Sequence, residues 1–118
     1  MNAIFAALLV AMSAGKDQAL HLYELNPKTG TLVQRAKYDL PGSPGSQCVS
    51  PDGNTLYVSV RSANSVAAFR IDHGMKTLVP LGITEIGANA AYVATDRTGR
   101  TLLWASYSGG VVGSHAIG

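Results

Sequence analysis

The stretch from Ser50 to Asp72, SPDGNTLYVSVRSANSVAAFRID, decides the fold because it holds two turn signals and two strand signals. Pro51-Asp52-Gly53-Asn54 is a turn cluster, because proline presets φ, aspartate bonds its own backbone, and glycine accepts a positive φ. A strand is indicated at Leu56–Val60, which is rich in β-branched and aromatic residues. A second strand is indicated at Ser65–Ile71, where side chains alternate in polarity, and the polar residues Arg61–Asn64 separate the two. The stretch therefore predicts a β-hairpin.

The pattern of this hairpin recurs along the chain with a constant offset, since Val66 lies 46 residues after Leu20 and 46 residues before Val112. The matching strand positions are Leu20, Val66 and Val112; Tyr23, Phe69 and His115; and Leu25, Ile71 and Ile117. A shared offset over several short strands predicts a β-propeller or another array of stacked blades.

The turn signals divide the chain into three groups of strands. With the four strands of a blade lettered A to D from the inside of the ring, the chain begins on strand B of a first blade. Blade one (about residues 3–40) is expected to hold a strand that includes Leu8–Met12, followed by Ala19–Leu25 and Thr31–Leu40. Blade two (about 46–86) is expected to hold Ser46–Ser50, Thr55–Val60, Ser65–Ile71 and Thr77–Ile86. Blade three (about 90–117) is expected to hold Ala90–Thr95, Arg100–Ser106 and Gly110–Ile117. No helix is predicted, because no apolar stripe recurs at helical spacing. We expect one all-β domain over residues 1–118, a partial β-propeller of about two and three-quarter four-stranded blades.

This arrangement leaves the ring open, since a closed propeller has about four to eight blades. Blade one lacks its inner strand, and blade three lacks its outer one. We therefore expect that a further blade would cover Leu102, Leu103 and Trp104 of blade three. Unpaired apolar strand edges are templates for pairing between chains, so we expect the chain to self-associate.

The N-terminal run Ile4–Met12 is apolar and is followed by Ser13-Ala14-Gly15, which is similar to the end of a signal peptide. However, no lysine or arginine precedes the run, and it is too short to span a bilayer. The repeat offset also places Leu8–Met12 on a strand. We interpret the run as a buried strand, with a signal remnant as the alternative.

Composition narrows the possible partners and cofactors. Charged residues make up 14% of the chain, and the formal net charge of +2 is spread without a run of lysine or arginine. Nucleic acid and membranes are therefore not expected as partners. Cys48 is the only cysteine, so we expect no intrachain disulfide, no cysteine-based metal site, and a small buried hydrophobe at this position. Neither an HxxxH spacing nor a Ser/His/Asp arrangement is present, and we expect no metal and no cofactor. We predict a cytoplasmic protein.

The segments SPDGNTLYVSV, NSVAAFRID, TGRTLLWASYSGGVV and LHLYELNPKTGTL resemble the lactonase family of seven-bladed β-propellers. That family includes the bacterial propeller-type 6-phosphogluconolactonases and the fungal muconate-lactonizing enzymes. The resemblance covers nearly the whole chain, but only the N-terminal part of the family's length. The chain departs from the family at Asn89, where proline is usual, and at Ser106, where asparagine is usual.

The resemblance implies that the chain is the N-terminal part of an enzyme that hydrolyses a sugar-acid lactone in the pentose phosphate pathway. It places the family's proposed catalytic histidine on strand A of the following blade, so no catalytic residue is assigned here and the chain alone should be inactive. The alternative is a non-catalytic propeller module for binding or surface assembly, because the PDG-x-x-LYV pattern also occurs in other propeller repeats.

In a propeller, the B–C and D–A connections surround the mouth of the central channel, where ligands usually bind. Arg61 and Lys16 lie in such connections and can offer positive charge to a sugar phosphate; solvated loop charges are the alternative. Tyr107 takes the place of Arg61 in blade three and can either cover a sugar ring or pack between blades. The histidines are not expected to converge: His115 should lie in the core or between blades, His21 should face a neighbouring blade, and His73 falls in a turn on the opposite face.

Overall fold

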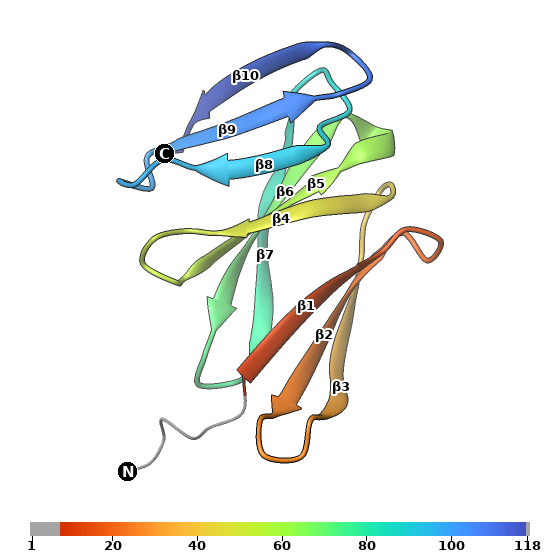
Figure 1. The fold of residues 1–118 in the computed structure, drawn as a ribbon, viewed down its shortest axis with the longest axis vertical. Helices are drawn as coiled ribbons and strands as arrows, with labels where there is room; N and C mark the ends of the chain where they lie inside the picture. Colours follow the sequence, from red (N-terminus) through yellow and green to blue (C-terminus); the bar gives the residue numbers. More distant parts are fainter. Residues whose placement is uncertain (1–7, 118) are drawn as a thin grey trace.

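The computed structural model describes residues 8–117, which form three antiparallel β-sheets placed one after another along the long axis of the molecule (Figure 1). The first sheet has the order β1-β2-β3, the middle sheet β4-β5-β6-β7, and the third sheet β10-β9-β8. The strands are β1 (Leu8–Ala14), β2 (Ala19–Asn26), β3 (Thr31–Asp39), β4 (Pro44–Val49), β5 (Thr55–Val60), β6 (Ser65–Asp72), β7 (Thr77–Glu85), β8 (Tyr92–Thr95), β9 (Thr101–Ser106) and β10 (Val111–Ala116). Each strand pairs with its neighbour in the chain, so the sequence prediction of an all-β array is confirmed, with strand ends that agree to within about two residues.

The offset of 46 residues has a counterpart in the strand registers. The Cα partners at equivalent positions are Val10 and Tyr23, Leu56 and Phe69, and Leu102 and His115. The register shift in the outer strand pair also recurs, because it follows Leu22 in the first sheet and Ala68 in the middle sheet. A slip of one residue would turn every side chain to the other face, so these matched registers keep equivalent positions facing equivalent neighbours.

Two hydrophobic cores lie between the sheets, and strand β5 contributes to both. The core between the first and middle sheets contains Leu20, Leu22, Leu40, Leu56, Val58, Val60, Ala67, Phe69 and Leu78, and the second core contains Tyr57, Val66, Ala90, Val93, Leu102 and Trp104. Successive side chains of a strand point to opposite faces, so Leu56 and Val58 face one core and Tyr57 the other. Leu56, Val58, Val66 and Phe69 are all buried.

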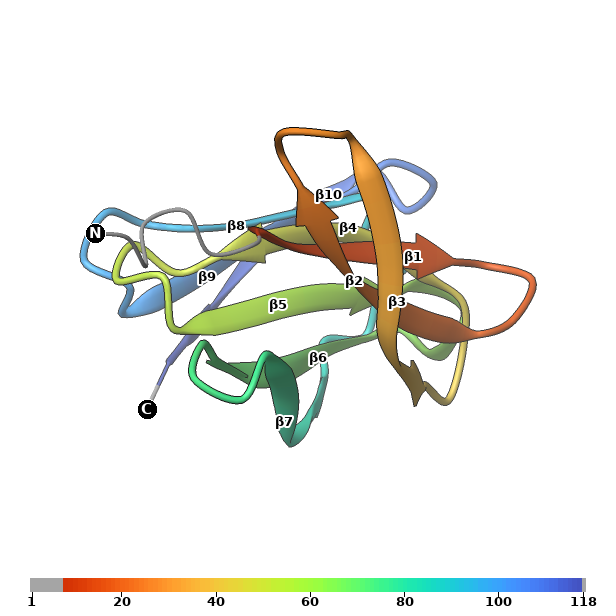
Figure 2. The same ribbon diagram turned by 90° about the horizontal axis from the view of Figure 1, so that it is seen from below.

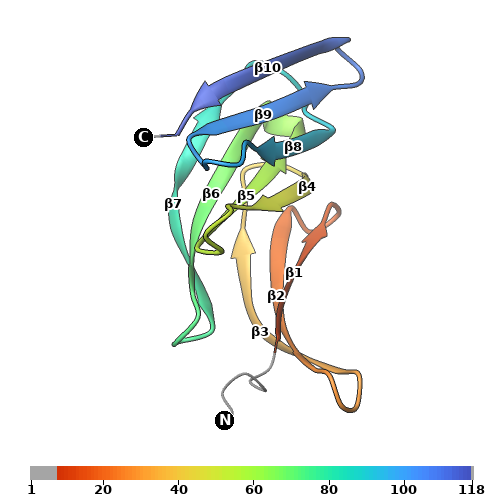
Figure 3. The same cartoon turned by 60° about the vertical axis from the view of Figure 1, so that its left-hand side comes forward.

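The connections between strands gather at different ends of the sheets. The β1–β2, β5–β6 and β9–β10 turns and the β3–β4 and β7–β8 crossovers lie on the right of Figure 1 and again on the right of Figure 2. We call this side the connection end. The β4–β5 and β8–β9 turns lie on the opposite side, and Figure 3 shows that β1, β4 and β8 lie on one side of the stack. The predicted grouping of B–C and D–A connections is therefore present.

The expectation of no helix holds in part. Among residues 8–117 no α-helix is present, but Arg61–Ala63 form one turn of 3₁₀-helix, η2, which ends at Asn64 in the left-handed conformation (φ 52°, ψ 42°). Asparagine adopts this conformation more readily than most residues do. A single turn of this kind leaves no helical periodicity in a sequence, and it keeps β5 and β6 paired as a hairpin.

The expectation for the outer face of the third sheet is also wrong in part. Leu102 and Trp104 are buried against the middle sheet, and only Leu103 of the three is exposed, at 42%. The reason is strand alternation, which sends neighbouring side chains to opposite faces even within an apolar run.

The N-terminal run lies partly within the described residues. Leu8–Met12 belong to β1, as predicted, whereas residues 4–7 lie outside the described residues. Between residues 8 and 117, no helix has the length and hydropathy needed to cross a membrane.

Candidate functional site

Hydrogen bonds join the first and middle sheets at the connection end. The Ser13 hydroxyl of β1 donates to the Gly45 carbonyl of β4 at 2.7 Å, and the Gln47 side-chain amide donates to Ser13 Oγ at 2.9 Å. The backbone N–H of Arg61 donates to the Ser43 carbonyl at 2.8 Å. Segments that are distant in the sequence are therefore joined by hydrogen bonds at this end.

Arg61 is the most restrained of the predicted binding residues. Its Nε–H donates to Asn89 Oδ1 at 2.6 Å, which links the middle sheet to the segment before β8. Its side-chain carbons lie against Gly45, where a β-carbon would come within 2.8 Å of Arg61 Cδ. Glycine at this position therefore leaves the space that the arginine side chain occupies.

Lys16 and Tyr107 also lie at the connection end, but the structure does not bring them to Arg61. Lys16 is exposed in the β1–β2 turn, and Tyr107 is 89% exposed in the β9–β10 turn. Within residues 8–117, neither side chain takes part in a hydrogen bond or an ion pair. The structure thus places one of the three predicted residues in a network and leaves two on the surface around it.

Sequence reasoning missed the role of Asn89, which it noted only as a departure from the family pattern. The Ser59 hydroxyl donates to the Ala90 carbonyl at 2.6 Å, and Ser46 Oγ accepts the backbone N–H of Val93 at 3.2 Å. These bonds fix the segment that carries Asn89. The available signal was a lone amide side chain in the small, apolar stretch Gly87-Ala88-Asn89-Ala90-Ala91.

The histidines lie in separate places, as predicted. His115 Nδ1 accepts the Trp104 indole N–H at 3.2 Å beside the second core, and His73 Nε2 lies 2.9 Å from the Gly53 carbonyl oxygen in a turn. His21 Nε2 lies 3.2 Å from Asp17 Oδ2 and its Nδ1 3.1 Å from Gln34 Nε2, both in the first sheet and its turn. That His21 faces a neighbouring blade stays a prediction.

The described residues hold no reactive cysteine and no metal site. Burial raises the pKa of the Cys48 thiol, so this side chain stays protonated and is a poor nucleophile. Among residues 8–117, no cluster of three or more His, Cys, Asp or Glu side chains could hold a metal ion. The connection end can therefore bind an anionic or hydroxylated ligand through Arg61 and the neighbouring hydroxyl and amide groups.

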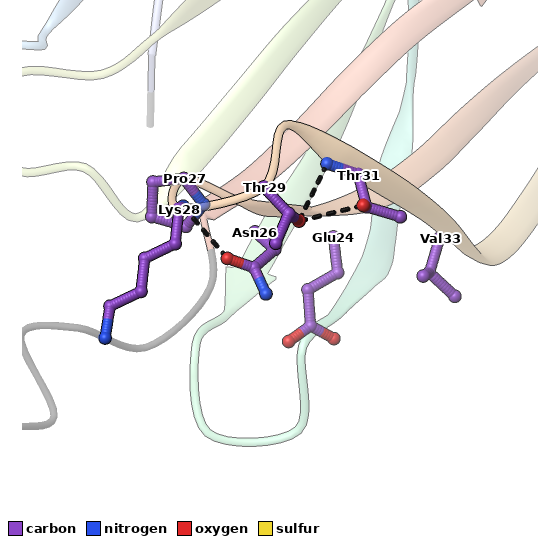
Figure 4. A pocket seen from close by; sticks show the side chains of 7 residues that line it. All are labelled: Glu24, Asn26, Pro27, Lys28, Thr29, Thr31 and Val33. Carbon is purple, nitrogen blue, oxygen red and sulfur yellow. Dashed lines mark hydrogen bonds between the residues drawn. The ribbon is translucent and has the colours of Figure 1, made fainter.

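A pocket of about 820 Å³ lies at the β2–β3 turn, away from the connection end (Figure 4). It is lined by Glu24, Asn26, Pro27, Lys28, Thr29, Thr31 and Val33. Asn26 Oδ1 accepts the backbone N–H of Lys28 at 2.9 Å, and Thr29 Oγ1 accepts that of Thr31 at 3.2 Å. Glu24 pairs with Lys76 Nζ at 2.9 Å, a bond that lowers the pKa of Glu24. The polar groups of Asn26, Thr29 and Glu24 in this pocket already form hydrogen bonds within the turn or the ion pair with Lys76. The volume of the pocket alone therefore does not make it the candidate site.

Comparisons with known proteins extend this description. The family model "Lactonase, 7-bladed beta-propeller" matches residues 6–118. A 6-phosphogluconolactonase from Cronobacter sakazakii is 35% identical over 103 residues, which are 87% of this chain and 31% of that protein. A solved structure from Bacteroides fragilis superposes with a TM-score of 0.83 at 22% identity, covering 100% of this chain and 34% of the other. The periplasmic gluconolactonase of Pseudomonas aeruginosa superposes with a TM-score of 0.73 at 21% identity, covering 86% and 35%.

The chain thus spans about a third of the length of these relatives. The structural matches support the fold, a partial β-propeller. The sequence match over residues 6–118 covers all the strands described above. The chain belongs to the lactonase family of seven-bladed β-propellers.

Proposed function

We propose that this chain contributes to the hydrolysis of a sugar-acid lactone in the cytoplasm, with 6-phosphogluconolactone, of the pentose phosphate pathway, as the first candidate substrate. The observation that carries the proposal is the similarity, over 87% of the chain, to a relative named 6-phosphogluconolactonase. In such a reaction, a base removes a proton from water, the water oxygen attacks the ring carbonyl, and hydrogen-bond donors stabilise the resulting oxyanion. The ring C–O ester bond then breaks, the ring oxygen takes up the proton that the base removed from water, and the product is an open sugar acid.

We assign the substrate to the connection end, around the mouth of the ring that the three sheets begin. Arg61 and Lys16 would supply positive charge to the phosphate or carboxylate, and the exposed ring of Tyr107 a flat face for the sugar. The three sheets correspond in this proposal to blades one, two and three, at about residues 3–40, 46–86 and 90–117. We expect the base to come from another part of a complete ring.

A chimera tests this proposal. The chain replaces the matching 31% of the Cronobacter sakazakii enzyme, and acid release from 6-phosphogluconolactone is compared with the spontaneous rate. We expect turnover within the usual enzymatic range of about 1–10³ per second from the chimera, and none from the 118-residue chain alone. A chimera that folds by circular dichroism but does not turn over would contradict the proposal. Turnover by the chain alone would show that its own residues supply the base.

A non-catalytic module for binding or assembly is the second candidate. Such a module would use the open face of the third sheet, where Tyr92, Leu103 and Val112 are 62%, 42% and 80% exposed. On either candidate, this face would pair with another sheet, in a complete ring or in a second copy of the chain. Light scattering at tens of micromolar tests association: a folded monomer would count against it. Cell fractionation tests the proposed cytoplasmic location.

A further inference from the structure

Only two of the nine cationic side chains are shielded from solvent, and the structure balances their charges differently. Lys76 and Arg61 are both half-buried. Lys76 Nζ lies 2.9 Å from Glu24 Oε2, whereas no carboxylate of residues 8–117 forms an ion pair with Arg61. A partly shielded charge is less well hydrated than an exposed one, and a counter-charge can compensate for this. Both side chains are partly shielded, but among residues 8–117 only Lys76 has a counter-charge.

The protein nevertheless holds the Arg61 side chain in one position. The 2.6 Å bond from Nε–H to Asn89 Oδ1 is short, as charge-assisted hydrogen bonds are. Gly45 leaves room for the side-chain carbons, and the Arg61 backbone N–H is bonded to the Ser43 carbonyl. Ordering a long side chain lowers its entropy, so these contacts oppose the rotation that would take the charge back into solvent.

The acceptor is held as firmly as the arginine. The bonds from Ser59 to the Ala90 carbonyl and from the Val93 N–H to Ser46 Oγ fix the backbone that follows Asn89. Ser59 is fully buried, so its hydroxyl has no competing water. The amide of Asn89 thus approaches Arg61 from a rigid segment.

With Nε–H engaged, the two Nη atoms of Arg61 still carry four N–H groups. Among residues 8–117, no acceptor bonds to either Nη atom. Paired N–H groups of a guanidinium match the oxygens of a phosphoryl or carboxylate group in bidentate fashion. We propose that Arg61, held by Asn89, is a preformed binding site for the oxyanion of a sugar acid, and that Asn89 is its positioning residue.

The neutral amide of Asn89 is central to this proposal. The amide fixes the guanidinium through an oxygen acceptor and leaves its charge intact. An aspartate of nearly the same shape would fix the guanidinium and also cancel its charge. The choice of a sugar acid as ligand rests on the proposed function, while the oxyanion site itself rests on the unpaired charge and on the hydrogen bonds around it.

Binding measurements on the 118-residue chain test the site without any requirement for turnover. Inorganic phosphate, gluconate and 6-phosphogluconate are titrated separately while the Arg61 Nε–H signal is followed by nuclear magnetic resonance. Phosphate and gluconate distinguish a phosphoryl from a carboxylate preference. The variants are Asn89→Asp and Arg61→Gln, with Arg97→Gln as control, because Arg97 is an exposed cation in the β8–β9 turn on the other side.

We expect the chain to bind 6-phosphogluconate and at least one of the simpler anions. Asn89→Asp keeps an acceptor for Nε–H but places a negative charge beside the guanidinium. It should therefore weaken anion binding by roughly tenfold or more, which is about the free energy of one charge-assisted hydrogen bond. Arg61→Gln should abolish binding, and Arg97→Gln should change it by less than about twofold, since an exposed charge contributes little.

The proposal is overturned if none of the three anions shifts the Arg61 signal, or if Asn89→Asp binds as tightly as the unsubstituted chain. In either case the Arg61–Asn89 bond would be a cross-link between sheets and nothing more. Anion binding together with an inactive chimera would leave this inference standing while the proposed function fails. An active chimera without anion binding by the chain would support the proposed function and overturn this inference.

Discussion

The middle and third sheets place equivalent strands in different surroundings. Strand β5 lies between two sheets, whereas β9 covers only one. Tyr57 and Leu103 are equivalent under the 46-residue offset, yet they are 7% and 42% exposed. Ser59 is fully buried and donates to the Ala90 carbonyl, while the equivalent residue Ala105 lies on the open face of β9.

This difference shows that burial in a propeller is a property of the stack and not of the strand. The strands have similar sequences and the same register, so their local structure is the same. Apolar area stabilises the fold, by about 25 cal/mol per Å², only where a neighbouring sheet removes it from water. The second apolar face of β9 therefore carries no such stabilisation in the described chain, and that contrast can be tested.

The largest effect is expected from a cavity in the core between the first and middle sheets. Leu56→Ala should lower the free energy of unfolding by about 2–5 kcal/mol, because the buried side chain leaves a space that the two sheets cannot fill. Leu103→Ala, the matched change on the open face of β9, should cost about 1 kcal/mol or less. Urea unfolding measures both. Equal losses would mean that the open face is covered in solution.

A smaller effect is expected from the hydroxyl of Ser59. Ser59→Ala should cost about 1–3 kcal/mol, since the Ala90 carbonyl loses its buried donor. The reciprocal change, Ala105→Ser, should alter stability by about 0.5 kcal/mol or less, because no sheet covers this position. Chemical denaturation of both variants decides the comparison. A neutral Ser59→Ala substitution would show that water replaces the serine.

A still smaller effect is expected on association through the open face. Leu103→Lys combined with Val112→Lys should raise the dissociation constant of self-association about tenfold, or ~1.4 kcal/mol, because charges interrupt the apolar surface. Val33→Lys, an exposed position on β3, serves as the control for added charge and should change the constant little. Sedimentation or light scattering measures the constants. If the control weakens association as much as the double variant, then net charge and not the open face governs it.

The smallest effects are expected in the turns, which should respond alike in both sheets. Asp52 accepts hydrogen bonds from the Ser50 hydroxyl and Asn54 N–H, and Asp96 from the Thr98 hydroxyl and Arg100 N–H; these bonds lower the pKa of each carboxyl group. A lowered pKa in the folded state means that the unfolded chain binds the proton more tightly. The stabilisation is therefore complete above the ordinary pKa of 3.8 and is lost as pH falls further.

Asp52→Asn and Asp96→Asn should each flatten the decline in stability below about pH 4 by a similar amount. Urea unfolding from pH 6 down to pH 2 measures the slopes. A large effect in one turn and none in the other would show that sheet stacking also influences these turns.

Much of the local structure could be predicted from the sequence. The turn at Pro51–Asn54, the hairpin of β5 and β6, and the offset of 46 residues each depend on neighbouring residues or on alternation along a strand. The 3₁₀ turn at Arg61–Ala63 could not be predicted in this way, because three residues leave no periodic pattern. The inward positions of Leu102 and Trp104 required the register of β9, which an uninterrupted apolar run does not reveal.

By itself, the sequence determined the strands, their order and the family. Turn chemistry and side-chain alternation depend on short segments, and the hairpins recur at a constant spacing of 46 residues along the chain. Only the tertiary structure decided which apolar faces are covered and which groups surround Arg61. Its partner Asn89 lies 28 residues away, and the space beside it depends on Gly45 in another strand. These contacts arise between stacked sheets, whose approach is set by packing and by the hydrogen bonds across their connections, so no local pattern around Arg61 contains them.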